Sequence, residues 1–123
     1  MQPSLFGPIT PKLWGHEVLL TNTPQYCGKF LVLAGGYQCS LHRHHIKDET
    51  FFVLEGEVTI DYIDPISGGI EVQKLGVGDQ FHVPPGMYHR FGSVGPALLL
   101  EISTPHKDSD VSRLVDSCPL ADQ

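Results

Sequence analysis

Three histidines of this chain fall within four residues, and a glutamate follows shortly after them. His42 and His44 are two residues apart, so on a β-strand both imidazoles point to the same side. Glu49 comes five residues after His44 and offers a carboxylate that a turn could bring back to the same point. Two imidazoles and a carboxylate suit Mn, Fe, Ni, Zn or Co and leave coordination positions open for a substrate. The sequence therefore predicts a divalent metal site.

A fourth ligand must come from elsewhere in the chain. His89 is the best candidate, because it follows the turn at 84–86 and would lie on a strand. His45 would point to the opposite side of its strand from its two neighbours. The spacing H-x-H alone is a weak signal, and its histidines could equally be solvated surface groups. The remaining histidines have no ligand spacing and are left out of the site: His16, His82 and His106.

Two longer spaced patterns contain all four proposed ligands. The first is G-x5-H-x-H-x4-E-x6-G over residues 36–56, and the second is G-x5-P-x-G-x2-H over residues 78–89. Both resemble the two motifs of the cupin family, in the same order, with Ser93 where the second motif usually ends in Asn. The resemblance implies an all-β, single-domain cupin, a double-stranded β-helix or jelly-roll barrel with few helices. It also implies one divalent metal ion per chain, bound by His42, His44, Glu49 and His89, with Mn expected first and Zn, Co, Ni or Fe as alternatives.

Short runs of β-branched, aromatic and aliphatic residues agree with a sandwich or barrel, in which closure removes exposed sheet edges. No window sustains a 3.6-residue apolar period, so few helices are expected. We divide the chain into an extended N-terminal arm at 1–15, a barrel at 16–117 and a C-terminal tail at 118–123, with Ser112–Val115 as one more edge strand. The runs predict strands near 17–21, 28–34, 38–44, 50–55, 57–63, 70–75, 79–83, 87–92 and 97–103.

The composition limits the partners. A chain of 123 residues suits one domain. The net charge of −6 with scattered basic residues argues against a nucleic-acid surface. No apolar run reaches the ~18–20 residues of a membrane helix, and the N-terminus does not resemble a secretory signal. Three cysteines without a C-x-x-C pair indicate reduced thiols and a cytoplasmic protein. We expect a small-molecule partner, no nucleic acid and no membrane.

Three segments resemble the cupin sugar isomerases, especially D-lyxose and D-mannose isomerases and more distantly mannose-6-phosphate isomerases. They are W-G-H-E at 14–17 with Y-C-G-K at 26–29, the ligand run S-L-H-R-H-H-I-K-D-E-T-F at 40–51, and E-I-S-T at 101–104 followed by Asp108, Asp110 and Arg113. The resemblance implies a metal-dependent aldose–ketose isomerase that works through a cis-enediolate. Glu101 inherits proton transfer, and Lys47 matches a substrate-contacting lysine. The implied substrate-binding residues are Lys29, Trp14, Tyr26 and Arg113. Small cupins are commonly dimers, so a homodimer is expected.

Each of these roles has a plainer alternative. Glu101 shares a strand face with Leu99 and Ser103, and the sequence does not say whether this face or the other lines the cavity. If the other face is the core, Glu101 is a solvated carboxylate. Lys47 and Lys29 would by default be surface lysines. The aromatic rings of Trp14 and Tyr26 could serve only in packing.

Two other functions use the same ligand set. A cupin dioxygenase binds iron with three histidines and a glutamate, and a non-catalytic cupin binds a sugar or effector without turnover. Phosphorylated substrates need clustered cations, and no Arg-rich run lies near the motifs. A free sugar is therefore favoured over a sugar phosphate, although Lys29, Arg43 and Arg90 could still converge.

Overall fold

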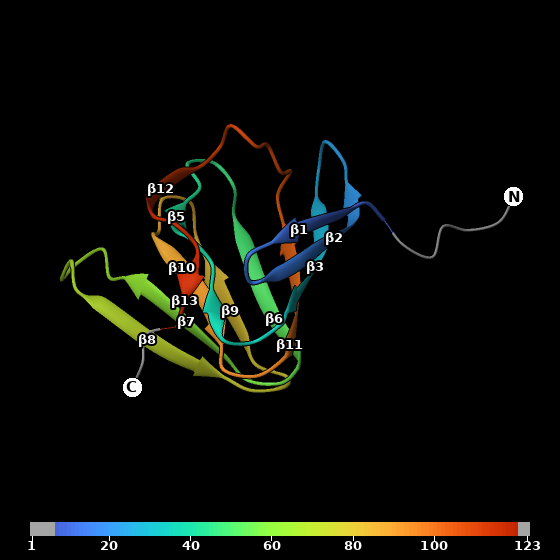
Figure 1. Cartoon of the computed structure of the whole chain (residues 1–123). Helices are drawn as coiled ribbons and strands as arrows, with labels where there is room; N and C mark the ends of the chain where they lie inside the picture. The colour runs from blue at the N-terminus through green and yellow to red at the C-terminus, as the bar shows by residue number, and fades with distance from the viewer. Residues whose placement is uncertain (1–6, 121–123) are drawn as a thin grey trace, which may run out of the picture.

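The computed structural model describes residues 7–120, and all regular structure in this range is β (Figure 1). The expected all-β cupin architecture is confirmed, and the described range contains no helix at all. Accordingly, nothing in it could cross a membrane as a helix. The strands are β1 Ile9–Lys12, β2 Gly15–Asn22, β3 Cys27–Leu33, β4 Tyr37–Gln38, β5 Leu41–Arg43, β6 Glu49–Glu55, β7 Val58–Ile63, β8 Ile70–Leu75, β9 Gln80–Val83, β10 His89–Ser93, β11 Ala97–Ser103, β12 Ser112–Val115 and β13 Cys118–Pro119.

The strands form two sheets. One has six strands in the order β1-β2-β3-β11-β6-β9. The other has seven: β12-β5-β10-β4-β13 form a path, β7 also pairs with β10, and β8 pairs with β7. All pairs are antiparallel, and β11 lies between β3 and β6, which are distant from it in sequence (Figure 1). In the other sheet, β5 and β10 carry residues of the two motifs and pair through His42 and His89.

The core is built from the inward-facing residues of strands along which buried and partly exposed side chains alternate. In β3, β6 and β11 every second residue is buried, and Leu31, Val53 and Leu99 are at most 1% exposed. From the other sheet, Ile60 and Phe91 pack into the same cluster. Burying apolar area of this kind contributes roughly 25 cal/mol per Å². The core therefore holds the two sheets together along the faces that also carry the site.

The predicted strand at 38–44 is two strands, β4 and β5, interrupted at Cys39 and Ser40. At the interruption the Cys39 N–H donates to the Phe91 carbonyl at 2.9 Å, so the segment stays attached to β10. On either side the pairing to β10 continues, at Gln38 and at His42. The break changes the register in which the chain pairs with β10. The alternation of apolar and polar residues in the sequence does not predict such a break.

Two segments predicted to lie outside the barrel also take part in the sheets. Ile9–Lys12, placed in the arm, pairs with β2 as β1, and Cys118–Pro119, placed in the tail, pairs with β4 as β13. Residues 1–6 and 121–123 lie outside the described residues. The edge strand predicted at Ser112–Val115 is confirmed as β12, next to β5.

Two motif glycines allow a test of the fold. Gly36 and Gly56 both have positive φ, at 83° and 78°. A Cβ at Gly36 would meet nothing within 4 Å, whereas one at Gly56 would lie 2.6 Å from the Pro96 carbonyl oxygen. We expect Gly36→Ala to cost about 1 kcal/mol of unfolding free energy from backbone strain alone. Gly56→Ala adds a backbone clash and should cost roughly 3 kcal/mol. Urea denaturation measures both, and equal losses would contradict this account.

Candidate metal centre

The four predicted ligands meet between the two sheets. His42 lies on β5 and is paired in register with His89 on β10, while Glu49 begins β6 in the other sheet. His44 follows β5 directly. One ligand atom from each of the four residues lies within 4.8 Å of the others. The spacing in the sequence thus identified four side chains that the fold brings to one point.

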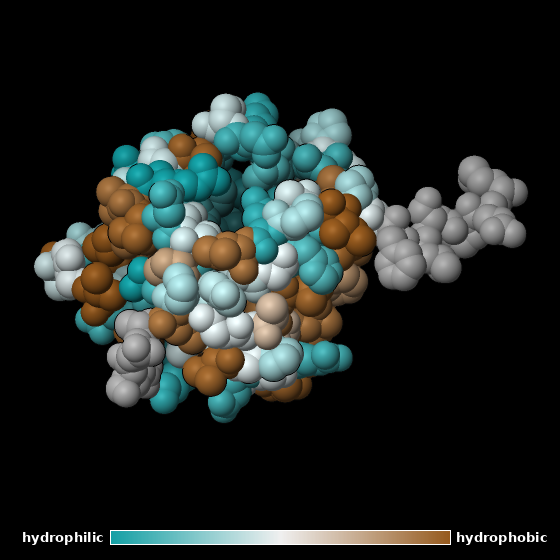
Figure 2. All heavy atoms as spheres, in the orientation of Figure 1, coloured by the Kyte–Doolittle hydropathy of each residue, from teal (hydrophilic) through white to brown (hydrophobic). Residues whose placement is uncertain are grey.

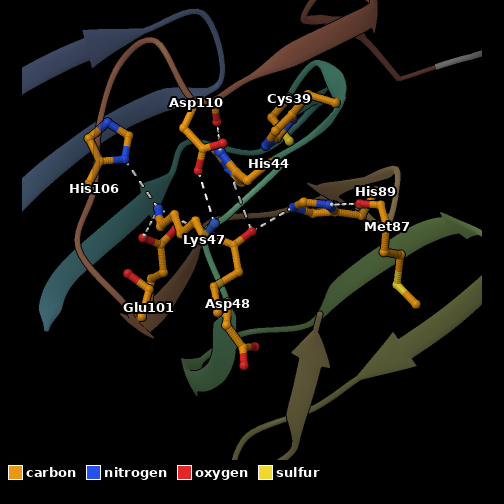
Figure 3. A network of polar contacts seen from close by, with 12 residues as sticks. Cys39, His44, Lys47, Asp48, Met87, His89, Glu101, His106 and Asp110 are labelled. Atoms are coloured by element: carbon orange, nitrogen blue, oxygen red, sulfur yellow. Dashed lines mark hydrogen bonds and ion pairs between the residues drawn. The ribbon is translucent and has the colours of Figure 1, made fainter. Parts of the chain in front are cut away.

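The three histidines are held in the same tautomer. Each Nδ1 lies close to a backbone carbonyl oxygen. His42 Nδ1 is 2.7 Å from the Ser40 carbonyl oxygen. His44 Nδ1 is 2.7 Å from that of Asp110, and His89 Nδ1 is 2.9 Å from that of Met87 (Figure 3). A carbonyl oxygen only accepts, so each Nδ1 carries the proton and each Nε2 has a free lone pair. Metal-binding histidines are oriented in this way by their outer hydrogen bonds.

The atoms that face the centre lack hydrogen-bond partners, and Glu49 Oε2 has only the ion-pair contact with Lys47 Nζ at 3.3 Å. Both carboxylate oxygens of Glu49 and Nε2 of His89 are buried without a hydrogen bond among the described residues. His89 Nε2 lies 2.8 Å from Glu49 Oε1, but with the proton of His89 on Nδ1 both atoms are acceptors, so no hydrogen bond joins them. Buried polar atoms left in this state are costly. A divalent cation would satisfy them, and the ligand set fits one.

The charges of the ligands also fit a cation. Burial, with the nearby His89, lowers the pKa of His42 to about 3, and burial also lowers the pKa of His44. Burial alone would raise the pKa of Glu49, but contacts with His89, Lys47 and His44 outweigh it and hold that pKa below its usual range. Two histidines are therefore neutral and Glu49 is ionised near neutral pH, as metal ligands must be.

A second polar cluster adjoins the ligands (Figure 3). Lys47 is buried, and its Nζ donates to Glu101 Oε2 at 2.8 Å and lies 3.3 Å from Glu49 Oε2. Burial lowers the pKa of Lys47, but the two carboxylates more than offset it and the pKa is raised. Burial and the charge of Glu49 raise the pKa of Glu101 to about 7, although Lys47 opposes the shift. The lysine therefore stays charged between two carboxylates.

Glu101, Lys47 and Lys29 are not surface residues, which was the alternative that the sequence left open for each of them. Glu101 is on the inward face of β11 with Leu99 and Ser103 and is only 6% exposed, so it is not a solvated carboxylate. Lys47 is likewise no surface lysine, at 3% exposed. Lys29 lies opposite Glu101 on β3, is buried, and its Nζ contacts Glu17 Oε2 at 3.4 Å. All three charged groups point into the molecule.

His106 belongs to this cluster, although no spacing in the sequence predicts it there. Its Nδ1 accepts from Lys47 Nζ at 3.3 Å, so its Nε2 carries the proton and donates to Asp108 Oδ1 at 2.9 Å. Its backbone exchanges two hydrogen bonds with the Asn22 side chain, at 3.1 and 3.2 Å. His106 has no ligand spacing, and only the path of the loop after β11 brings it beside Lys47.

Asp110 fastens the loop that carries His44 and Lys47. Its carboxylate accepts the backbone N–H groups of His45 at 2.8 Å, Ile46 at 3.1 Å and Lys47 at 2.9 Å. Its own carbonyl accepts from His44 Nδ1. These bonds also hold the pKa of Asp110 below its usual value against the effect of burial. One residue thus fixes both a ligand ring and the loop that follows it.

The centre opens into a cavity of about 790 Å³ between the sheets. Figure 2 shows the hollow at the top of the molecule, surrounded largely by hydrophilic residues. Trp14 lines it while packing edge-on against Phe91, with ring centroids 4.9 Å apart. Arg113 lines it from the exposed strand β12. Tyr26, expected to bind substrate, is 53% exposed and is not among the lining residues.

The remaining histidines are outside the centre, as the sequence predicted. His45 Nε2 contacts Ser112 Oγ at 2.7 Å on the surface. His82 pairs with Asp48 at 2.6 Å, and both side chains are about half exposed. The possible phosphate-binding arginines do not converge either: Arg90 pairs with Asp61 at 2.9 Å, and Arg43 stacks over the Tyr88 ring. Neither arginine lines the cavity.

Comparison with known proteins identifies the family. The family model described as a cupin domain matches residues 29–103, which include all four ligands. This chain belongs to the cupin family. It is also 34% identical over 71 residues to the uncharacterized protein YdbB of Bacillus subtilis (strain 168), covering 58% of this chain and 57% of YdbB. The cupin chain thus spans little more than half of that relative.

Solved structures share the fold of this cupin at low sequence identity. The capsular polysaccharide assembling protein CapF of Staphylococcus aureus matches 92% of this chain and 32% of its own, with TM-score 0.81 and 17% identity. A mutant oxalate decarboxylase of Bacillus subtilis matches 88% of this chain and 30% of its own, with TM-score 0.78 and 16% identity. KdgF of Halomonas sp. matches 83% and 91%, with TM-score 0.70 and 19% identity. Identities this low establish the shared fold alone.

The first prediction of this centre concerns stoichiometry. Wild-type protein should bind one divalent ion per chain, measured by calorimetric titration with Mn²⁺ and by elemental analysis. His89→Ala removes a fully buried ligand and should weaken binding by at least about 100-fold, more than the loss of an outer hydrogen bond. His82→Ala is the matched control, because His82 contacts only Asp48 at the surface. Equal affinities for the two variants would refute the assigned ligands.

A second prediction concerns Asp110. Asp110→Ala removes the acceptor of three backbone N–H groups and should weaken Mn²⁺ binding by about 10–100-fold through misplacement of His44. Asp110→Asn keeps one accepting oxygen and should lose less. Asp108→Ala is the control, since the Asp108 side chain is fully exposed and contacts only His106. If Asp110→Ala binds Mn²⁺ as the wild type does, the loop does not depend on this anchor.

Proposed function

We propose that this cupin is a metal-dependent aldose–ketose isomerase that acts on a small free sugar such as D-lyxose or D-mannose. The proposal rests mainly on one observation: a buried carboxylate, Glu101, lies in the cavity beside the ligands and is held at 2.8 Å by a buried lysine, Lys47. A metal site that only bound a ligand would not need this costly pair. A proton-transfer reaction does need a positioned acid–base group.

The residues have defined tasks in such a reaction. A divalent cation held by the four ligands, with Mn²⁺ as the first expectation, would supply a Lewis acid that polarises the substrate carbonyl. Glu101 takes the proton from the carbon beside the carbonyl and returns it to the neighbouring carbon. Its pKa of about 7 suits both steps near neutral pH. Lys47 orients Glu101 and provides a positive charge close to the oxygens where negative charge develops.

The cavity supports a polar, uncharged substrate. Its volume of about 790 Å³ is within the range of small-molecule sites. Of its four cationic side chains, the two buried ones are already paired with carboxylates, Lys29 with Glu17 and Lys47 with Glu101, while Lys12 and Arg113 are exposed. A phosphate would have to compete with those pairs. We therefore retain a free sugar over a sugar phosphate, with Lys29, Trp14 and Arg113 among the cavity residues available to contact it.

The decisive experiment is an isomerase assay on Mn²⁺-loaded protein with D-lyxose, D-mannose and D-fructose supplied separately. The wild type should form the partner ketose or aldose. Glu101→Gln keeps the shape of the side chain but cannot accept the proton, so kcat should fall by about 10²–10⁴-fold while Mn²⁺ stays bound. Glu71→Gln, an exposed carboxylate on β8, is the matched control and should leave kcat unchanged.

Other outcomes would redirect the proposal. If Glu101→Gln turns over like the wild type, Glu101 is not the base. If the wild type converts none of the sugars but consumes oxygen with an iron-loaded site, it is a cupin dioxygenase. If it binds sugar with no turnover, it is a binding module.

A further inference from the structure

The buried ammonium group of Lys47 has three acceptors close to it (Figure 3). A lysine carries three N–H donors and no acceptor. Its Nζ lies 2.8 Å from Glu101 Oε2, 3.3 Å from Glu49 Oε2 and 3.3 Å from Nδ1 of His106. The two carboxylates already have tasks, as the acid–base group and as a metal ligand. His106 is a neighbour of Lys47 to which the proposed reaction gives no role.

The proton of the His106 ring is fixed from the far side of the ring. Nε2 donates to Asp108 Oδ1 at 2.9 Å, so the proton-free nitrogen, Nδ1, faces Lys47. Burial and the charge of Lys29 lower the pKa of His106, although the hydrogen bond with Asp108 opposes the shift. The ring is therefore neutral near neutral pH and acts toward Lys47 as an acceptor.

The position of His106 is fixed through its backbone. The Asn22 side chain accepts from the His106 N–H at 3.1 Å and donates to the His106 carbonyl oxygen at 3.2 Å. The ring lines the cavity, and its centroid lies 6.4 Å from that of the ligand His44. His106 thus contacts Lys47 from a defined place at the wall of the space that is open to a substrate.

The loop of His106 is also tied to the loop of Lys47 on both sides of their contact. On one side, the Thr104 N–H donates to the Asp48 carbonyl oxygen at 3.0 Å, and the Asp48 N–H donates to Thr104 Oγ1 at 3.0 Å. On the other side, the Asp110 carboxylate accepts the Lys47 N–H at 2.9 Å. The contact between the two side chains is therefore built into the way the two loops pack.

We propose that His106 is a positioning residue, which accepts one N–H of Lys47 and keeps this lysine in the place from which it orients Glu101. The consequence for catalysis rests on the proposed function, whereas the contact itself does not depend on a substrate. A lysine has a flexible stem and rotatable donors, so two carboxylate contacts leave its ammonium group free to swing. A third acceptor, on a ring that Asp108 and Asn22 hold, removes this freedom.

The contacts form a chain from the surface to the acid–base group. Asp108 orients the His106 ring, and the ring accepts from Lys47. Lys47 in turn donates to Glu101, the residue proposed to move the proton. Reacting groups of enzymes are commonly oriented by a second residue that a third one holds. A displacement of only ~1 Å in such an array can lower the rate by about 10²-fold.

The first test compares His106→Leu with His106→Asn in Mn²⁺-loaded protein, on the sugar that the wild type converts. Leucine leaves an N–H of buried Lys47 without an acceptor, so kcat should fall by about 10–100-fold with little change in KM. Asparagine places its side-chain oxygen near the position of Nδ1 and should recover most of the lost kcat. His82→Leu, at an exposed histidine, is the matched control and should leave kcat unchanged. Each variant should still bind one Mn²⁺ per chain, because no ligand is changed.

The second test observes the lysine directly. Lysine side chains labelled with the heavy nitrogen isotope, in protein loaded with diamagnetic Zn²⁺, give an NMR order parameter for each ammonium group. The signal of Lys47 is the one that disappears in Lys47→Met. Its order parameter should be high in the wild type, fall in His106→Leu and recover in His106→Asn. Lys74, exposed on β8, is an internal reference and should be equally mobile in all variants.

The two tests separate this inference from the proposed function. A wild type that converts none of the sugars, but whose Lys47 is rigid only when position 106 offers an acceptor, would refute the function and support the positioning. The inference is overturned if His106→Leu keeps the order parameter or the kcat of the wild type. It is also overturned if His106→Asn loses as much as His106→Leu, because the accepting atom then does not hold the lysine.

Discussion

The metal centre depends on three backbone carbonyls, each of which accepts a hydrogen bond from Nδ1 of one of the three histidines. These bonds orient the rings toward the buried carboxylate of Glu49. Each carbonyl fixes the proton on Nδ1 and so presents an unprotonated Nε2 to the centre. The carbonyls come from three places: Ser40 in the break between β4 and β5, Met87 in the turn before β10, and Asp110 in the loop after β11. The break in the predicted strand at 38–44 is therefore part of how the site is built.

The buried charges depend on that same arrangement. Lys47 lies between Glu49 and Glu101, and removing it would leave two buried carboxylates without a countercharge. Asp110 fastens the backbone of Lys47 as well as the ring of His44, so the ligands and the lysine are positioned together. His106 closes the cluster toward solvent through exposed Asp108. The polar network is continuous from the ligand Glu49 to the surface.

One strand of the six-stranded sheet contributes both to the core and to the polar cluster beside the ligands. The alternation along β11 places Leu99 in the core and Glu101 in the cavity on the same face of the strand, while Leu100 faces outward. Such a strand needs apolar or paired neighbours on each side, which explains why its sequence is almost uniformly apolar with one glutamate.

The sequence by itself determined the class of fold and a candidate ligand set. Through two spaced patterns that resemble the cupin motifs, it predicted His42, His44, Glu49 and His89 together, and the fold brings these four side chains to one point. It did not determine whether Glu101 faces the cavity, since a period of two separates the faces of a strand but does not say which is buried. Nor did it reveal that Lys29 and Lys47 are buried, that Tyr26 lies away from the cavity, or that His106 and Asp110 join the site. The positions of Lys47, His106 and Asp110 follow from contacts between segments more than 50 residues apart, as between Lys47 and His106 or His44 and Asp110. The sequence alone does not predict these contacts, because they arise only when the loop after β11 packs against the turn after β5.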